Sequence, residues 1–95
     1  MTLATRYVAV VRKASPSDFG VHFPDLPGCV TAGRNMQDAR RVAAEALARH
    51  LEGLAAKGRP APQARDLAAI RDDPEWQNAT TLILVEAPRP DAGTS

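Results

Sequence analysis

The chain has 95 residues, which is enough for one small domain and too few for two separate hydrophobic cores. Twelve basic and eleven acidic residues give a formal net charge of +1, so charge offers no reason to expect nucleic acid or a membrane surface as the main partner. A single cysteine excludes an intramolecular disulfide, and no apolar run is long enough to cross a bilayer or to form an export signal, so we expect a cytoplasmic protein.

Three short β-prone runs occupy the first third of the chain. They are Tyr7–Val11, Phe19–Phe23 and Cys29–Ala32, and clusters of turn-forming residues separate them. In the second run the odd-numbered residues are apolar and share one face, whereas Gly20 and His22 fall on the other. Because consecutive strands with short connections usually pair, the pattern predicts an antiparallel meander.

The segment Pro24–Gly28 between the second and third runs has two compatible interpretations. Its two prolines lack ladder donors and Gly28 can adopt a positive φ, so the segment can be a rigid turn that sets the strand register. It can also be a preorganised apolar loop that presents Phe23, Leu26 and Pro27 to a protein partner at little entropic cost.

One long amphipathic helix follows the strands. Asn35 is a typical N-cap with an acidic group in the first turn, and Gly58 is a typical C′ residue, so we expect a helix over about residues 36–57. Its apolar residues recur at steps of three and four and form one stripe. They are Ala39, Val42, Ala43, Ala46, Leu47, Leu51 and Leu54.

The last third of the chain contains a short helix and a final strand. Asp66 caps the predicted helix Leu67–Arg71, and Trp76 is expected to cover the core. The run Thr80–Glu86 has an apolar centre, which predicts a strand that is buried on both faces or lies in the sheet interior. Residues 87–95 lack apolar residues that could pack, so we expect a domain over 1–86 and a disordered tail over 87–95.

The predicted order is therefore β-β-β-α-(short α)-β, an α+β fold with the main helix on one face of a small antiparallel-rich sheet. Within it, the stretch Asp18–Gly33, with sequence DFGVHFPDLPGCVTAG, closely resembles the signature of HicB-family antitoxins. Residues Ala44–Leu54 resemble that family's helix, and Asp73-Pro74-Glu75 before the last strand is also similar.

The resemblance implies a partial ribonuclease-H-like fold and a bacterial toxin–antitoxin function. Members of this family neutralise a small mRNA-cleaving HicA toxin by masking its catalytic histidine, and many repress their own operon through an added ribbon-helix-helix or helix-turn-helix segment. Only nine residues follow Glu86, which is too few for such a segment. We therefore expect no direct binding of nucleic acid by this chain alone.

Our first hypothesis is an antitoxin that occludes the active site of a HicA-like toxin with the Phe23–Cys29 loop and the helix face. The alternative is an orphan structural or regulatory domain that self-associates without a toxin or DNA. Under both hypotheses an exposed edge strand favours a homodimer or a higher homo-oligomer. The candidate partner-binding residues are Phe23, Asp25, Leu26, Pro27, Cys29, Glu45 and Glu52.

Two kinds of catalysis can be weighed against these binding functions. A metal-dependent nuclease needs several converging carboxylates, yet the predicted strands contain no acidic residue before Glu86. Cys29 with His22 or His50 is the one conceivable nucleophile–base pair, but a cysteine that starts a strand usually behaves as a small buried hydrophobic residue. We therefore expect a protein that is not an enzyme, with no catalytic residue, cofactor or metal ion.

Overall fold

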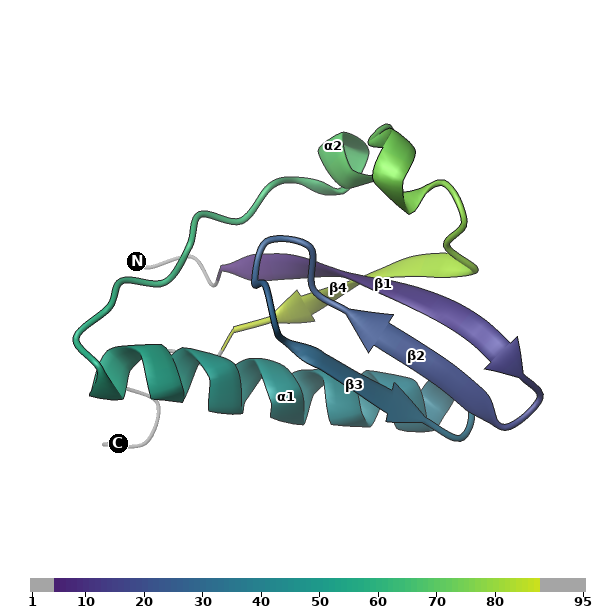
Figure 1. The fold of residues 1–95 in the computed structure, drawn as a ribbon, viewed down its shortest axis with the longest axis horizontal. Helices are drawn as coiled ribbons and strands as arrows, with labels where there is room; N and C mark the ends of the chain where they lie inside the picture. Colours follow the sequence, from purple (N-terminus) through teal and green to yellow (C-terminus); the bar gives the residue numbers. More distant parts are fainter. Residues whose placement is uncertain (1–4, 88–95) are drawn as a thin grey trace.

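The fold is a four-stranded antiparallel sheet that carries one long helix on one face (Figure 1). The computed structural model describes residues 5–87. The strand order is β3-β2-β1-β4, and the predicted α+β class and element order are confirmed. The elements are β1 (Arg6–Ser15), β2 (Asp18–His22), β3 (Val30–Gly33), α1 (Met36–Ala56), α2 (Leu67–Arg71), the 3-10 helix η1 (Pro74–Trp76) and β4 (Thr81–Glu86).

Strand β1 is the buried centre of the sheet, with β2 on one side and β4 on the other. Its residues from Tyr7 to Val11 are all buried, and they alternate between the two faces. The expectation that residues 80–86 form an interior strand or one buried on both faces is wrong. Strand β4 lies at the edge, and Leu84 is 47% exposed while Ile83 and Val85 are buried against the α1 side.

Helix α1 covers one face and begins and ends close to the predicted positions. The Asn35 side chain accepts a hydrogen bond from the Asp38 N–H, and the Asp38 carboxylate accepts one from the Arg34 N–H. At the other end Gly58 has φ +69° and its N–H donates to the carbonyl of Ala55. The predicted N-cap and C′ glycine are therefore confirmed.

Small residues let α1 approach the sheet closely. Ala39 and Ala43 are fully buried, and a Cβ placed on Gly33 of β3 would lie 2.5 Å from the Ala39 nitrogen. Gly33 is thus required by backbone proximity. Tyr7, Phe23, Leu26 and Leu47 fill the same layer, which is the main core of the protein.

The opposite face of the sheet is partly covered by α2 and η1, which Figure 1 shows on the side away from α1. Val8 and Val10 of β1 form a second cluster with Ile70, and Trp76 and Leu82 pack against it. Trp76 therefore covers core residues as expected, on the face that α1 does not reach. Within residues 5–87 no helix is both long and apolar enough to cross a membrane.

Ala87 also belongs to the folded unit. It is 8% exposed, and its N–H donates to the Thr5 carbonyl at 2.7 Å. Ala87 thus lies one residue beyond the expected boundary, and the rest of the expected tail, 88–95, lies outside the described residues.

Candidate partner-binding surface

The Pro24–Gly28 loop is closed by its own backbone hydrogen bonds. The Leu26 N–H donates to the Phe23 carbonyl at 3.0 Å, and the Cys29 N–H donates to the Leu26 carbonyl at 2.9 Å. The Phe23 N–H donates to the Cys29 carbonyl at 3.2 Å, which joins the two ends, and Gly28 has the left-handed φ of +88°. The loop is therefore a rigid turn between β2 and β3, as one of the two interpretations predicts.

The loop does not present all its apolar side chains to solvent. Phe23 is 3% exposed and Leu26 is fully buried, because both point into the core beneath α1. The expectation that they are offered to a partner is wrong for these two side chains, whereas Pro27 is exposed. Phe23 and Leu26 anchor the loop, and Pro27 is the exposed apolar residue of the loop.

A groove of about 360 Å³ runs between the edge strand β3 and helix α1. Cys29 is a member of its lining, and Glu45 is contributed by the facing helix. The complete lining is Gly28, Cys29, Val30, Thr31, Val42, Glu45, Ala46, Arg49 and His50. The structure thus brings together two predicted site residues that lie sixteen positions apart in the sequence, Cys29 and Glu45.

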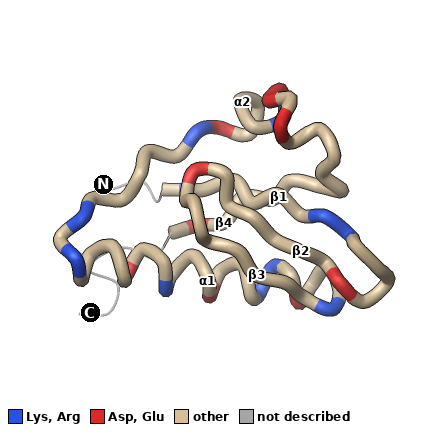
Figure 2. Tube along the Cα trace, in the orientation of Figure 1, with Lys and Arg blue, Asp and Glu red and all other residues tan. Residues whose placement is uncertain are grey.

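The rim of this groove on α1 carries charges of both signs, which Figure 2 shows interspersed along the helix. Arg41 contacts the Asp38 carboxylate at 2.6 Å and the Glu45 carboxylate at 3.0 Å. The pKa of Asp38 is lowered, most of all by the hydrogen bond from the Arg34 N–H and next by the hydrogen bond from the Arg41 side chain. Glu52 is exposed and lies seven positions after Glu45, so it continues the same stripe beyond the groove.

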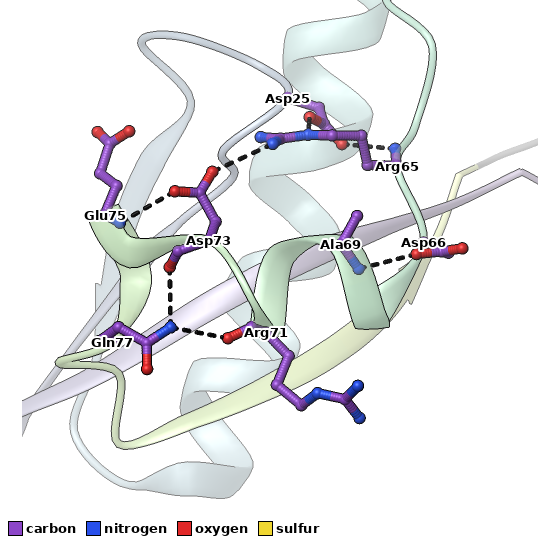
Figure 3. Close-up of polar contacts among 8 residues, drawn as sticks. All are labelled: Asp25, Arg65, Asp66, Ala69, Arg71, Asp73, Glu75 and Gln77. Atoms are coloured by element: carbon purple, nitrogen blue, oxygen red, sulfur yellow. Dashed lines mark hydrogen bonds and ion pairs between the residues drawn. The ribbon is translucent and has the colours of Figure 1, made fainter.

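Asp25, the remaining predicted site residue, is used inside the protein (Figure 3). Its carboxylate accepts hydrogen bonds from the Arg65 N–H at 2.7 Å and from the Arg65 Nε at 2.6 Å. The Arg65 guanidinium also reaches Asp73 at 3.3 Å, and these contacts raise the pKa of Arg65, the hydrogen bond to Asp25 most of all. The hydrogen bonds from Arg65 to Asp25 tie the loop to the segment before α2. Because the Asp25 side chain is also only 10% exposed, it is not free for a partner.

The segment between α1 and α2 is also held by Tyr7. The Tyr7 hydroxyl donates to the Pro62 carbonyl, and burial, together with the nearby charge of Asp25, raises the pKa of Tyr7. Sequence reasoning missed both Tyr7 and Arg65 as residues that shape this surface. No local pattern could reveal them, because each contact joins residues forty or more positions apart.

Cys29 is shielded rather than activated. It is 4% exposed, its thiol donates to the Ala46 carbonyl at 3.7 Å, and burial raises the pKa of the thiol. His50 lines the same groove and His22 lines a second one, but a raised thiol pKa disfavours the thiolate that nucleophilic catalysis requires. Among residues 5–87 no group of three or more His, Cys, Asp or Glu side chains is placed to hold a metal ion.

The second groove, of about 270 Å³, lies on the other side of the loop, between β2 and η1. His22 and Trp76 form part of its wall, with ring centroids 6.3 Å apart. The Arg12 guanidinium lies 5.5 Å from the centroid of the Trp76 ring, so a cation–π contact fastens η1 to β1.

Comparison with known proteins identifies relatives across most of the chain. Residues 7–89 match the family model described as the HicB-like antitoxin of bacterial toxin–antitoxin systems. A chain of the HicA3 and HicB3 toxin–antitoxin complex is 32% identical with a TM-score of 0.75, and the match covers 90% of this chain and 100% of that one. The N-terminal domain of the Burkholderia pseudomallei antitoxin HicB is 26% identical with a TM-score of 0.75, over 90% of this chain and 100% of that one.

A phage protein extends this comparison. An uncharacterized 14.9 kDa protein of Haemophilus phage HP1 is 31% identical over 64 residues, which are 67% of this chain and 48% of that protein. This chain thus corresponds to about half the length of the phage protein. Since the family model covers more than half of the sequence and the fold agrees with solved HicB structures, the chain belongs to the HicB-like antitoxin family of bacterial toxin–antitoxin systems.

Proposed function

We propose that this protein neutralises a HicA-like toxin by binding it stoichiometrically and covering its active site. The observation that carries the proposal is the similarity to a whole chain of the HicA3–HicB3 complex, together with family membership. The protein acts as a binding partner and not as an enzyme. We place it in the cytoplasm of a bacterial cell, where the mRNA that such a toxin cleaves is found.

The toxin docks, in this proposal, on the groove between β3 and α1, with Pro27 at the adjoining loop tip. The groove is lined by residues of a rigid turn and a long helix, so little conformational entropy is lost on binding. A toxin that binds RNA needs basic groups around its active site, and the exposed side chains of Glu52 and of Glu45, which Arg41 also contacts, carry the opposite charge. Phe23, Leu26 and Cys29 contribute by holding the loop in place from beneath.

Co-expression tests this proposal in cells. The HicA-like toxin encoded beside the gene should arrest growth, and this protein should restore it. A genome with no such gene beside this one, or growth arrest that persists when the two proteins are made together, would overturn the proposal.

Charge reversal tests the surface. The double variant Glu45→Lys with Glu52→Lys should weaken toxin binding by about tenfold or more. The matched control is Asp72→Lys, a charge reversal of an exposed acid next to α2, which should leave the affinity unchanged. Equal affinities for the α1 variant and the wild-type protein would place the toxin elsewhere.

A second candidate function is self-association without a toxin partner, as an orphan structural or regulatory domain. One observation favours it: β4 is an edge strand with an exposed leucine. The two functions are compatible, because β3 and β4 are opposite edges of the sheet. We expect this chain alone to bind no DNA, and an operator-binding assay with the purified protein checks that expectation.

A further inference from the structure

Strand β4 has an unpaired side among the residues that the structure describes. Arg6 lies opposite Glu86, so Thr5 and Ala87 are the next pair, and the Ala87 N–H donates to the Thr5 carbonyl. Because alternate residues of an antiparallel ladder direct their backbone groups to the same neighbour, residues 81, 83 and 85 face β1. The N–H and C=O groups of residues 82, 84 and 86 therefore point away from the sheet.

This edge lacks the features that usually prevent strand pairing. Between residues 81 and 86 there is no proline, no lysine and no bulge, and Glu86 at the end is the one charged residue. The irregularity in the sheet lies between Lys13 and Ser15, in the β1–β2 ladder. Leu84, at the middle of the outward row, is 47% exposed.

We propose that a second copy of this chain pairs with β4 in an antiparallel manner, with the two-fold axis passing beside Leu84. Leu84 then lies opposite Leu84 of the second copy, and Leu82 lies opposite Glu86. All outward N–H and C=O groups of residues 82, 84 and 86 find partners in this register. The two four-stranded sheets join into one continuous sheet.

The neighbouring register, with its axis beside Ile83, satisfies fewer groups. It would set Glu86 opposite Thr80 of the second copy, but the Thr80 N–H already donates to the Val11 carbonyl at 2.8 Å. The register with its axis beside Leu84 does not require Thr80 to pair with Glu86 of the second copy.

Side chains and charges agree with the same register. The two Leu84 side chains meet on the face away from α1, where each is exposed in the single chain. The two Glu86 carboxylates are set four residues apart, which is about 14 Å along the strands, so screening makes their repulsion small.

This inference deepens the self-association proposed above and leaves the toxin surface free on both copies, since that surface lies at the β3 edge. It predicts that one dimer binds two toxin molecules, and that part rests on the proposed function. The pairing itself needs no toxin.

A disulfide experiment tests the register. Cys29→Ala removes the native thiol, and Leu84→Cys or Glu86→Cys is then introduced singly into the full chain. In the proposed register the two Leu84 residues form a hydrogen-bonded pair, whose Cα atoms are about 5.5 Å apart and thus within disulfide range. The two Glu86 residues are too far apart for a disulfide. On mild oxidation we expect a disulfide-linked dimer from Leu84→Cys and monomer from Glu86→Cys. No dimer from Leu84→Cys, or an equal yield from both variants, would overturn the register.

Sedimentation velocity tests whether β4 is the edge strand through which two copies associate. Leu84→Lys should weaken self-association at least about tenfold. The matched control is Val30→Lys at the other edge of the sheet, where Val30 is 57% exposed, and it should associate like the wild type. A wild-type protein that stays monomeric at high concentration, or self-association that only Val30→Lys abolishes, refutes the inference. A monomeric Leu84→Lys variant that still inhibits the toxin separates this inference from the proposed function.

Discussion

Removing Asp25 should cost more stability than removing its ion-pair partner Arg65. In Arg65→Ala the backbone N–H of residue 65 still donates to Asp25, so only the side-chain contacts at 2.6 and 3.3 Å disappear. In Asp25→Ala the backbone bond at 2.7 Å is lost as well. Hydrogen bonds to a charged group contribute about 1.5–3 kcal/mol each, and the 43% exposure of the Arg65 side chain lowers its share.

We therefore expect a loss of about 1 kcal/mol in the free energy of unfolding for Arg65→Ala and about 2–3 kcal/mol for Asp25→Ala. Once Asp25 is absent, the Arg65 side chain has lost its main partner. The double variant should accordingly cost little more than Asp25→Ala alone, with a coupling energy of about 1 kcal/mol.

Urea denaturation of the four proteins measures these differences at equilibrium. Equal losses for the two single variants, or losses that add fully in the double variant, would show that Asp25 and Arg65 do not hold the loop as the structure indicates. A matched control is Asp72→Ala, which removes an exposed acid that contacts only its neighbour Arg71 among the described ion pairs. It should change stability by less than about 0.5 kcal/mol.

Three further predictions concern glycine, the core and pH. Gly33→Ala should destabilise the protein by about 3 kcal/mol because a Cβ there meets the backbone of α1. Gly53→Ala should stabilise the protein by about 0.5–1 kcal/mol because a Cβ there meets open space. Thermal unfolding of both variants measures the two effects. Leu26→Ala should cost about 2–5 kcal/mol in urea denaturation, since Leu26 is fully buried, and a cost below 1 kcal/mol would contradict its anchoring role. The pKa of Asp38 is lowered in the folded state, chiefly by the hydrogen bond from the Arg34 N–H. The ionised Asp38 carboxylate therefore stabilises the fold fully above its ordinary pKa of 3.8, and this stabilisation is lost as the pH falls through the lower pKa of the folded state. The stability difference between wild type and Asp38→Asn should therefore shrink between about pH 5 and pH 2, and a difference that grows on acidification would refute this.

Local signals in the sequence were enough to predict α1 and the faces of β2. Helix α1 has a capping asparagine, a closing glycine and a continuous apolar stripe, and all three act within a few residues. Strand β2 alternates strictly, and the structure places Val21 and Phe23 in the main core and His22 against Trp76 on the other face.

The position of β4 in the sheet could not be predicted in the same way. Its run Leu-Ile-Leu-Val is apolar at every position, and such a run fits either an interior strand or an edge strand that uses its exposed face for another contact. Strand β1 is the interior strand, since it pairs with β2 on one side and β4 on the other. Which strands pair is decided by the assembly of the whole sheet and not by the residues of one strand. Leu84 is the residue at which this difference is visible.

The candidate site was predicted in part. The loop and the helix face do meet, since Cys29 and Glu45 line one groove, but loop sequence alone does not say which apolar side chains point inward. Phe23 and Leu26 turn toward the core, and Asp25 binds Arg65 from forty positions away. Contacts between residues so far apart depend on the tertiary fold and leave no spacing pattern in one sequence.

The central claim, neutralisation of a toxin by stoichiometric binding, is tested most directly by titration. Purified HicA-like toxin from the same genome cleaves a labelled RNA, and this protein is added in increasing amounts. We expect cleavage to fall linearly and to stop at one chain per toxin. Full cleavage at a large excess of this protein, or complete inhibition far below one chain per toxin, would contradict the account.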